Sequence, residues 1–200
     1  MANLREAHSK FLYCNQQYLA ADFNSAQSIV KISEGGYQKF PNDSGNYTGG
    51  EKGSGTFIGT NFGISAPTLK SYLKYEPSEA DMRNLTYATA LDIYRKRYWN
   101  VIKGDEIKSQ NLANMIYDLS VNPVRPGAKQ IVIDSFKIVE KDDTINKYEI
   151  IKINAANPDK LFNEIGKKRE ELYKARGGEF LPSWLNRLKN LGWTGAGLVK

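Results

Sequence analysis

A glycine-rich polar stretch, residues 35–63, is the feature that most limits how this chain can fold. Its glycines alternate with Asn, Ser and Thr: Gly45, Gly49, Gly50, Gly53, Gly55 and Gly59. This composition favours turns over helices and central strands. We therefore expect a long loop with at most a short irregular hairpin, ending in segments 56–58 and 61–64. A loop of this length inside a compact domain is usually functional or mobile.

The rest of the chain has the apolar spacing of amphipathic helices. Helices are expected over residues 4–20, from Phe23 towards residue 34, from Pro67, from Ser78, over 86–101, over 109–121 and from Pro158. Asp22 or Asn24 could cap the second of these. Ser78 and Asp81 have the spacing of a capping box. The chain is therefore predicted to be mainly α.

The charge balance points to a polyanionic partner without identifying it. Lys and Arg number 28 against 22 acidic residues, a formal charge of +6. Nucleic acid, a membrane surface and the bacterial cell wall all fit this excess. The charge run at Lys167, Lys168 and Arg169 is typical of a solvated helix face. No recognised nucleic-acid-binding motif is present, so nucleic-acid binding is the weakest of these hypotheses.

Rare residue types exclude several kinds of site. A single cysteine, Cys14, excludes an intramolecular disulfide. With one histidine, His8, a zinc centre or a Ser-His-Asp triad is not expected. No apolar run is long enough to cross a membrane, and residues 1–20 lack the apolar core of a signal peptide. We expect synthesis in the cytoplasm and action on the cell wall after release or export, through a holin or a secretion system.

Glu34 is the candidate catalytic residue. It lies where an amphipathic helix meets the helix-stopping pair Gly35-Gly36. The negative end of a helix dipole opposes ionisation of a carboxyl group, and a shielded carboxyl there would keep its proton, as a general acid must. Asp43 follows in the polar loop, where it is either the second carboxylate of a glycosidase or the residue that forms an Asx-turn.

Several ordered motifs resemble the Glu-Gly-Gly-Tyr N-acetylmuramidase family, which includes secretion activator proteins and phage endolysins. They are Glu34-Gly35-Gly36-Tyr37, Pro41-Asn42-Asp43-Ser44-Gly45, Thr60-Asn61-Phe62-Gly63-Ile64-Ser65, the segment 90–99 and Tyr117-Asp118-Leu119-Ser120-Val121-Asn122. Segments 169–173 and 180–187 resemble the family's C-terminal peptidoglycan-binding region. The resemblance implies a lysozyme-like α+β fold, in which the glycine-rich loop forms one wall of a cleft, and Glu34 as catalytic acid.

The resemblance also suggests further site residues, each with a structural alternative. The family's threonine corresponds to Thr48 by distance from Asp43 or to Thr60 by its neighbours, and we favour Thr60. Tyr37, Phe62 and Trp99 are either sugar-stacking or core residues. Asp118 and Asn122 share one helix face, and they either line the cleft or cap the helix end. For Arg187 and Trp184, packing is favoured over contact with the wall.

The sequence thus predicts an enzyme that cuts the β-1,4 bond between N-acetylmuramic acid and N-acetylglucosamine in peptidoglycan, without metal or organic cofactor. Two alternatives remain: a lytic transglycosylase, and a non-catalytic peptidoglycan-binding or secretion-accessory protein. The expected divisions are an N-terminal helix (1–22), a muramidase domain (23–123) and a peptidoglycan-binding subdomain (124–200).

Overall fold

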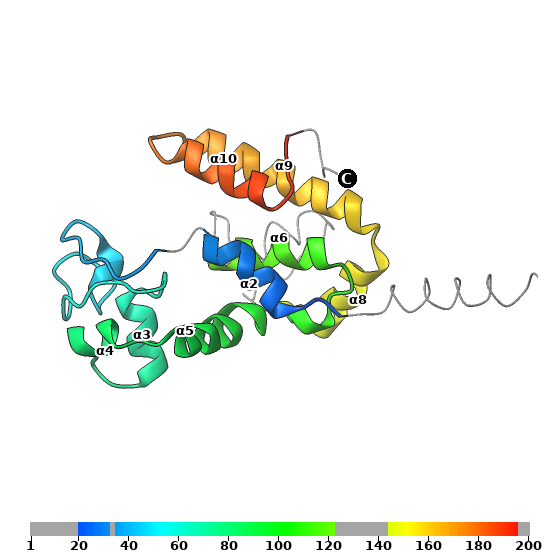
Figure 1. Ribbon diagram of the computed structural model, residues 1–200. Coiled ribbons are helices and arrows are strands. Elements are labelled where there is room, and N and C mark those ends of the chain that lie inside the picture. The colour runs from blue at the N-terminus through cyan, green and yellow to red at the C-terminus, as the bar shows by residue number, and fades with distance from the viewer. Residues whose placement is uncertain (1–19, 33–34, 123–143, 196–200) are drawn as a thin grey trace, which may run out of the picture. The chain divides into compact units, whose positions relative to one another are not determined.

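The computed structural model describes residues 20–32, 35–122 and 144–195 (Figure 1). These residues form helices α2 (Phe23–Ile32), α3 (Ala66–Leu73), α4 (Glu79–Arg83), α5 (Tyr87–Tyr94), α6 (Gln110–Val121), α8 (Lys147–Ala155), α9 (Pro158–Arg176) and α10 (Leu181–Asn190). Short 3₁₀ turns η1 (Ser44–Asn46) and η3 (Gly104–Glu106) and the π-helical segment η2 (Arg95–Trp99) complete the elements of this part. The predicted mainly α fold is confirmed.

Local capping chemistry explains where several helices begin. Asp22 Oδ2 accepts a hydrogen bond from Ser25 N at 2.6 Å, so of the two predicted caps Asp22 is the one that caps α2. Ser78 and Asp81 form the predicted capping box: Ser78 Oγ accepts from Asp81 N at 3.2 Å, and Asp81 Oδ2 accepts from Ser78 N at 2.7 Å. Each such bond satisfies a donor that the helix start leaves free.

The chain packs into two compact units. Val30–Arg97 forms one, which we call the loop unit, and the described residues up to Ile29 and from Tyr98 onward form the other, which we call the helical unit. The predicted division into 1–22, 23–123 and 124–200 rested on family resemblance and stays a prediction. Residues 1–19 and 123–143, which include His8, Cys14 and nearly all of the helix predicted over 4–20, lie outside the described residues.

An aromatic cluster forms part of the core of the helical unit. Phe23, Trp99 and Tyr117 meet edge to face, with ring centroids 5.5–5.9 Å apart. Trp99 is fully buried, so it is a core residue and not a sugar-stacking one. Gly104 lies so close to its indole that a Cβ there would come within 2.2 Å of the ring. The Trp99 Nε1 atom donates to Asp105 Oδ1 at 2.8 Å, which satisfies its only polar atom.

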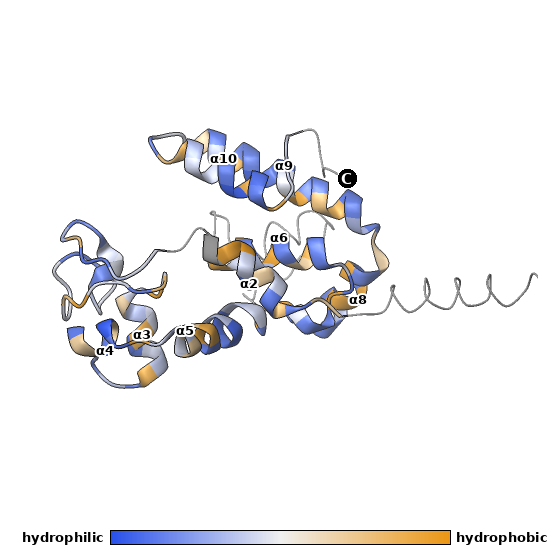
Figure 2. Cartoon of the chain, viewed as in Figure 1, coloured by the Kyte–Doolittle hydropathy of each residue, from blue (hydrophilic) through white to orange (hydrophobic). Residues whose placement is uncertain are grey.

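Helices α9 and α10 lie side by side and α9 also packs against α6 (Figure 1). Each of these helices carries both hydrophilic and hydrophobic residues (Figure 2), as amphipathic helices do. The interpretation of Arg169 as part of a solvated run is wrong, because its side chain is fully buried. Arg169 follows Ile165 and precedes Tyr173 at four-residue spacing, so it lies on the same buried stripe of α9.

The predicted helix over residues 86–101 is interrupted. α5 ends at Tyr94 and the chain continues as the π-helical η2. Apolar spacing does not distinguish the two, because a π turn inserts one extra residue without ending the helix. Tyr94, the last residue of α5, is buried, and its hydroxyl donates to Phe62 O at 3.0 Å.

The glycine-rich stretch forms turns and three isolated antiparallel bridges among the described residues: Gln38–Thr60, Tyr47–Phe57 and Asn61–Ile64. These isolated bridges stand in place of the expected irregular hairpin. Ile58 and Ile64 anchor the stretch in the core of the loop unit. No described helix combines the length and apolarity needed to cross a lipid bilayer. In the described ranges no group of three His, Cys, Asp or Glu side chains is arranged to hold a metal ion.

Candidate active site

Glu34 lies outside the described residues, directly after the end of α2, and the chain is described again from Gly35. The predicted catalytic acid therefore keeps the status of a sequence prediction. The structure does define the segment that follows it, residues 35–43. This segment contains two of the predicted site residues, Tyr37 and Asp43.

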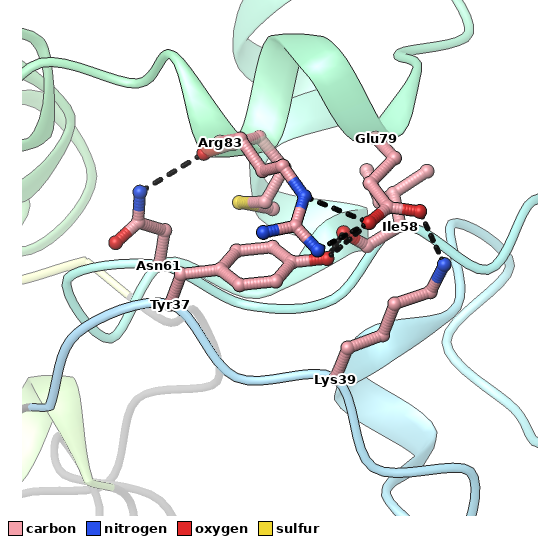
Figure 3. Close-up of polar contacts among 7 residues, drawn as sticks. Tyr37, Lys39, Ile58, Asn61, Glu79 and Arg83 are labelled. Carbon is pink, nitrogen blue, oxygen red and sulfur yellow. Dashed lines mark hydrogen bonds and ion pairs between the residues drawn. The ribbon is translucent and has the colours of Figure 1, made fainter.

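One face of this segment is held by Glu79, at the start of α4 (Figure 3). Its carboxylate accepts hydrogen bonds from Tyr37 Oη at 2.9 Å and Arg83 Nε at 2.8 Å, and it pairs with Lys39 Nζ. The Arg83 guanidinium also lies over the Tyr37 ring, 4.0 Å from its centroid. Tyr37 and Lys39 are two residues apart in extended backbone, so their side chains project to the same side.

These contacts set the ionisation of the cluster. The hydrogen bond from Lys39, followed by those from Arg83 and Tyr37, lowers the pKa of Glu79 to about 2. Burial, followed by the hydrogen bond to Glu79, raises the pKa of Tyr37 above its usual value. At neutral pH Glu79 is therefore an anion and Tyr37 a neutral donor, which is the combination that the hydrogen bond between them requires.

The other face of the segment is held by Asn46, which is fully buried in η1. Its Nδ2 donates to Phe40 O at 3.0 Å and to Gln38 Oε1 at 3.2 Å, and its Oδ1 accepts from the Thr60 hydroxyl. The backbones of Gln38 and Thr60 also exchange two hydrogen bonds, at 2.9 and 2.8 Å. Segment 37–40 is thus fixed from both sides.

Asp43 forms the turn that begins η1. Its Oδ1 accepts from Gly45 N at 2.9 Å and its Oδ2 accepts from Gln38 Nε2 at 3.1 Å. This is the Asx-type capping that the sequence offered as the structural alternative. The residue is exposed, and the structure brings its carboxylate next to Gln38. Its role as second carboxylate stays a prediction.

The two candidate threonines occupy different positions. Thr48 is buried and its hydroxyl contacts Glu76 while accepting from Thr56 N at 2.8 Å. Lys70, followed by Thr48, lowers the pKa of Glu76 to about 2, so this carboxylate is a strong acceptor. Thr60 is half-buried and joins segment 37–40 through Asn46 and the Gln38 bridge. Of the two, Thr60 is the one whose backbone pairs with Gln38, the residue directly after Tyr37.

The predicted aromatic contacts to sugar are already engaged with protein. Tyr37 is covered by Arg83, and Phe62 meets Tyr87 edge to face at 5.7 Å. Phe62 also has a positive φ of 49°, a conformation that is uncommon for a bulky residue. Their predicted roles in substrate binding are untested, but neither ring is presented as an open platform.

Asp118 and Asn122 belong to the helical unit, whereas segment 37–43 belongs to the loop unit. Asp118 is 1% exposed, and its two oxygens pair with Arg169 Nη2 at 2.8 Å and Arg187 Nε at 2.7 Å. With its amide oriented to satisfy both groups, Asn122 accepts from Arg187 Nη1 at 2.8 Å. Packing of α10 through Arg187 is therefore confirmed, and Trp184 stacks on Tyr173 at 5.4 Å.

Sequence analysis missed three residues that organise the site: Asn46, Glu79 and Arg83. The only local signal was the i, i+4 spacing of Glu79 and Arg83 on one short helix. Their partners Tyr37 and Lys39 are about forty residues away in sequence, so no spacing rule could pair them. Asn46 looked like one more polar residue of a turn.

Comparison with known proteins identifies the family. The family model described as glycosyl hydrolase 108 matches residues 26–123, a span that contains every predicted site residue from Glu34 to Asn122. Residues 26–123 belong to the glycosyl hydrolase 108 family. The resemblance seen in the sequence motifs is confirmed, and the chain is placed among the glycoside hydrolases.

One solved structure has a fold similar to that of this chain. The structure of SagA from Brucella abortus has a TM-score of 0.68 and 26% sequence identity, covering 84% of this chain and 90% of that one. A search of curated protein sequences finds no match. The glycosyl hydrolase 108 match ends at residue 123, so a peptidoglycan-binding role for residues 124–200 stays a prediction.

Proposed function

We propose that this glycosyl hydrolase 108 member is a muramidase that cleaves the β-1,4 bond between N-acetylmuramic acid and N-acetylglucosamine in peptidoglycan. The observation that carries the proposal is the family match over a span in which Glu34 precedes a segment held on both faces. General acid catalysis needs a carboxyl group in a defined position relative to the scissile bond. Rigid backbone directly after Glu34 favours such a position.

In the proposed reaction, Glu34 protonates the glycosidic oxygen as the bond to the muramic acid carbon breaks. A water molecule then completes hydrolysis at that carbon. The end of α2 supports this role, since the helix dipole opposes ionisation of a carboxyl group at a C-terminus. Thr60 is the hydroxyl that we propose for holding the water.

The proposal is tested by clearing of purified sacculi, with Glu34→Gln beside the wild type. The substitution keeps the shape of the side chain but removes the transferable proton, so we expect clearing to fall by a factor of at least about 100. Glu51→Gln is the matched control, because Glu51 is an exposed glutamate of the same unit. Clearing by Glu34→Gln at the wild-type rate, with folding intact, would indicate a non-catalytic wall-binding protein.

Mass spectrometry of the released fragments distinguishes the chemistry. Hydrolysis leaves a reducing N-acetylmuramic acid end. A 1,6-anhydro end would instead mean that the sugar's own hydroxyl displaced the leaving group, and the enzyme would be a lytic transglycosylase.

The role of Asp43 can be determined by comparing two substitutions. Asn caps a turn about as well as Asp but carries no charge, whereas Ala can neither cap the turn nor supply a charge. If Asp43 only forms the turn, Asp43→Asn keeps activity and Asp43→Ala lowers it. Loss of activity in both variants would assign the carboxylate to the reaction.

A further inference from the structure

Most aromatic side chains around the candidate site are already paired with protein. Tyr37 lies under Arg83, and it is so close to Gly59 that a Cβ there would be 2.9 Å from the ring. Phe57 stacks on Tyr47 at 4.7 Å and has Lys39 Nζ 4.5 Å from its centroid. These rings stabilise the loop unit and are not free to contact a ligand.

Phe40 is different, because its ring is exposed while its backbone is fixed. It is 63% exposed. Its carbonyl oxygen accepts hydrogen bonds from Asn46 Nδ2 at 3.0 Å and from Asp43 N at 3.1 Å. Pro41 follows it, and a proline restricts the preceding residue to extended backbone. The molecule thus holds a large apolar side chain in water at a defined place, where burial by a ligand would recover hydrophobic free energy.

The surroundings of Phe40 are polar and able to form hydrogen bonds. The exposed residues Asn42 and Asp43 follow it in the same turn. An aromatic ring beside amide and carboxylate groups suits a ligand with one apolar face and a polar edge. A pyranose ring has this form: its C–H bonds make an apolar face, and its hydroxyl and acetamido groups project from the edge.

We propose that Phe40 binds one N-acetylamino sugar ring of the glycan strand by stacking, and so forms a sugar subsite on the segment that follows the Glu34-Gly35-Gly36-Tyr37 motif. The identity of the sugar rests on the proposed function. The turn that carries Asp43 holds this platform in place, and its polar groups meet the edge of the same sugar.

The experiment measures binding and turnover separately. Binding is measured with peptide-free glycan strands on the Glu34→Gln background, where the strand is not cut. We expect Phe40→Ala to weaken binding about tenfold, because stacking of one ring is lost. Phe40→Trp, which keeps an aromatic face, should bind within about twofold of its parent. On the active background, Phe40→Ala should raise KM by a similar factor and leave kcat unchanged, since the contact holds the sugar equally in ground and transition states.

Tyr148→Ala is the matched control, because Tyr148 is exposed to nearly the same extent, 60%, but lies on α8 in the helical unit. It should bind like its parent. Unchanged affinity in Phe40→Ala, or an equal loss in Tyr148→Ala, would overturn the proposal. A wild-type protein that binds strands through Phe40 but releases no reducing ends would refute the muramidase proposal and leave the subsite standing.

Discussion

The carboxylates that join distant segments are exposed in the loop unit and buried in the helical unit. Glu76 and Glu79 reach across the loop unit at its surface, with side chains 44% and 36% exposed. Asp118 joins α6 to α9 and α10 from a position that is 1% exposed. Exposed ion pairs contribute little to stability, whereas a buried pair that loses one partner leaves an uncompensated charge.

This contrast shows which interactions stabilise each unit. The helical unit depends on apolar helix faces, and among its described residues the buried pair of Asp118 and Arg169 would be strongly destabilised by the loss of one partner. In the loop unit the glycine-rich stretch has little regular structure, so its segments are fixed by many smaller polar contacts around Asn46, Glu76 and Glu79. A loop held in this way keeps its backbone rigid while it leaves side chains such as Phe40 at the surface.

The largest effect is expected from Asp118→Ala, which leaves Arg169 buried without its partner. We expect a loss of about 3–5 kcal/mol in the free energy of unfolding. All three tryptophans, Trp99, Trp184 and Trp193, belong to the helical unit, so tryptophan fluorescence in urea reports this loss directly. Glu171→Ala is the control: it removes an exposed pair with Lys167 in the same unit and should cost less than about 1 kcal/mol. Equal costs would remove the contrast between buried and exposed pairs.

A smaller effect is expected from Asn46→Ala in the loop unit. The substitution removes the Asn46 donor to the Gln38 side-chain oxygen, one of the two donors to Phe40 O, and the acceptor of the Thr60 hydroxyl, at a cost of about 1–3 kcal/mol. Amide hydrogen exchange at Gln38 and Thr60, whose backbones bond to each other, should accelerate. Asn46→Asp should be nearly as damaging because a carboxylate cannot donate. Asn42→Ala, at an exposed position, should leave exchange unchanged, and protection that survives Asn46→Ala would show that the backbone bonds suffice.

The smallest effect concerns the pH dependence of Glu79. Its pKa falls on folding from 4.5 to about 2, so its contribution to stability is fully present above pH 4.5. That contribution is lost as the pH falls towards 2 and the carboxylate takes up a proton. The difference in unfolding free energy between wild type and Glu79→Gln should therefore be constant above pH 5 and shrink between pH 4.5 and 2. A difference that does not change over this range would mean that the charge of Glu79 contributes nothing.

Much of the helical unit could be predicted from sequence because its signals are local. Apolar spacing predicted α6 and α9, and one of the two candidate caps, Asp22, marks the start of α2. Even Arg169 carried a usable signal, since it lies four residues after Ile165 on the buried stripe. The prediction that Arg169 is solvated was wrong because it was based on the charges of Lys167 and Lys168 and not on the position of Arg169 along the helix.

In the loop unit the helices were predicted as well, from Pro67, from Ser78 and over residues 86–101, but the glycine-rich stretch could be predicted only as a loop. Its glycines exclude long helices, but nothing in their spacing tells which polar side chains will meet. Tyr37 and Glu79, or Thr60 and Asn46, are brought together only when the chain folds back on itself. The exposed ring of Phe40 was missed for the same reason: exposure depends on what other segments cover, and here they cover Tyr37 and Phe57 instead.

By itself, the sequence determined the family, the mainly α class and the candidate acid Glu34, because motifs, helix periodicity and caps are properties of neighbouring residues. The tertiary structure alone decided that Thr60 rather than Thr48 pairs with Gln38, that Asp118 is enclosed by two arginines, and that Glu79 and Asn46 fix residues 37–40. Those outcomes depend on contacts between residues distant in the chain, and their free energies are set by burial and hydrogen-bond geometry that exist only in the folded protein.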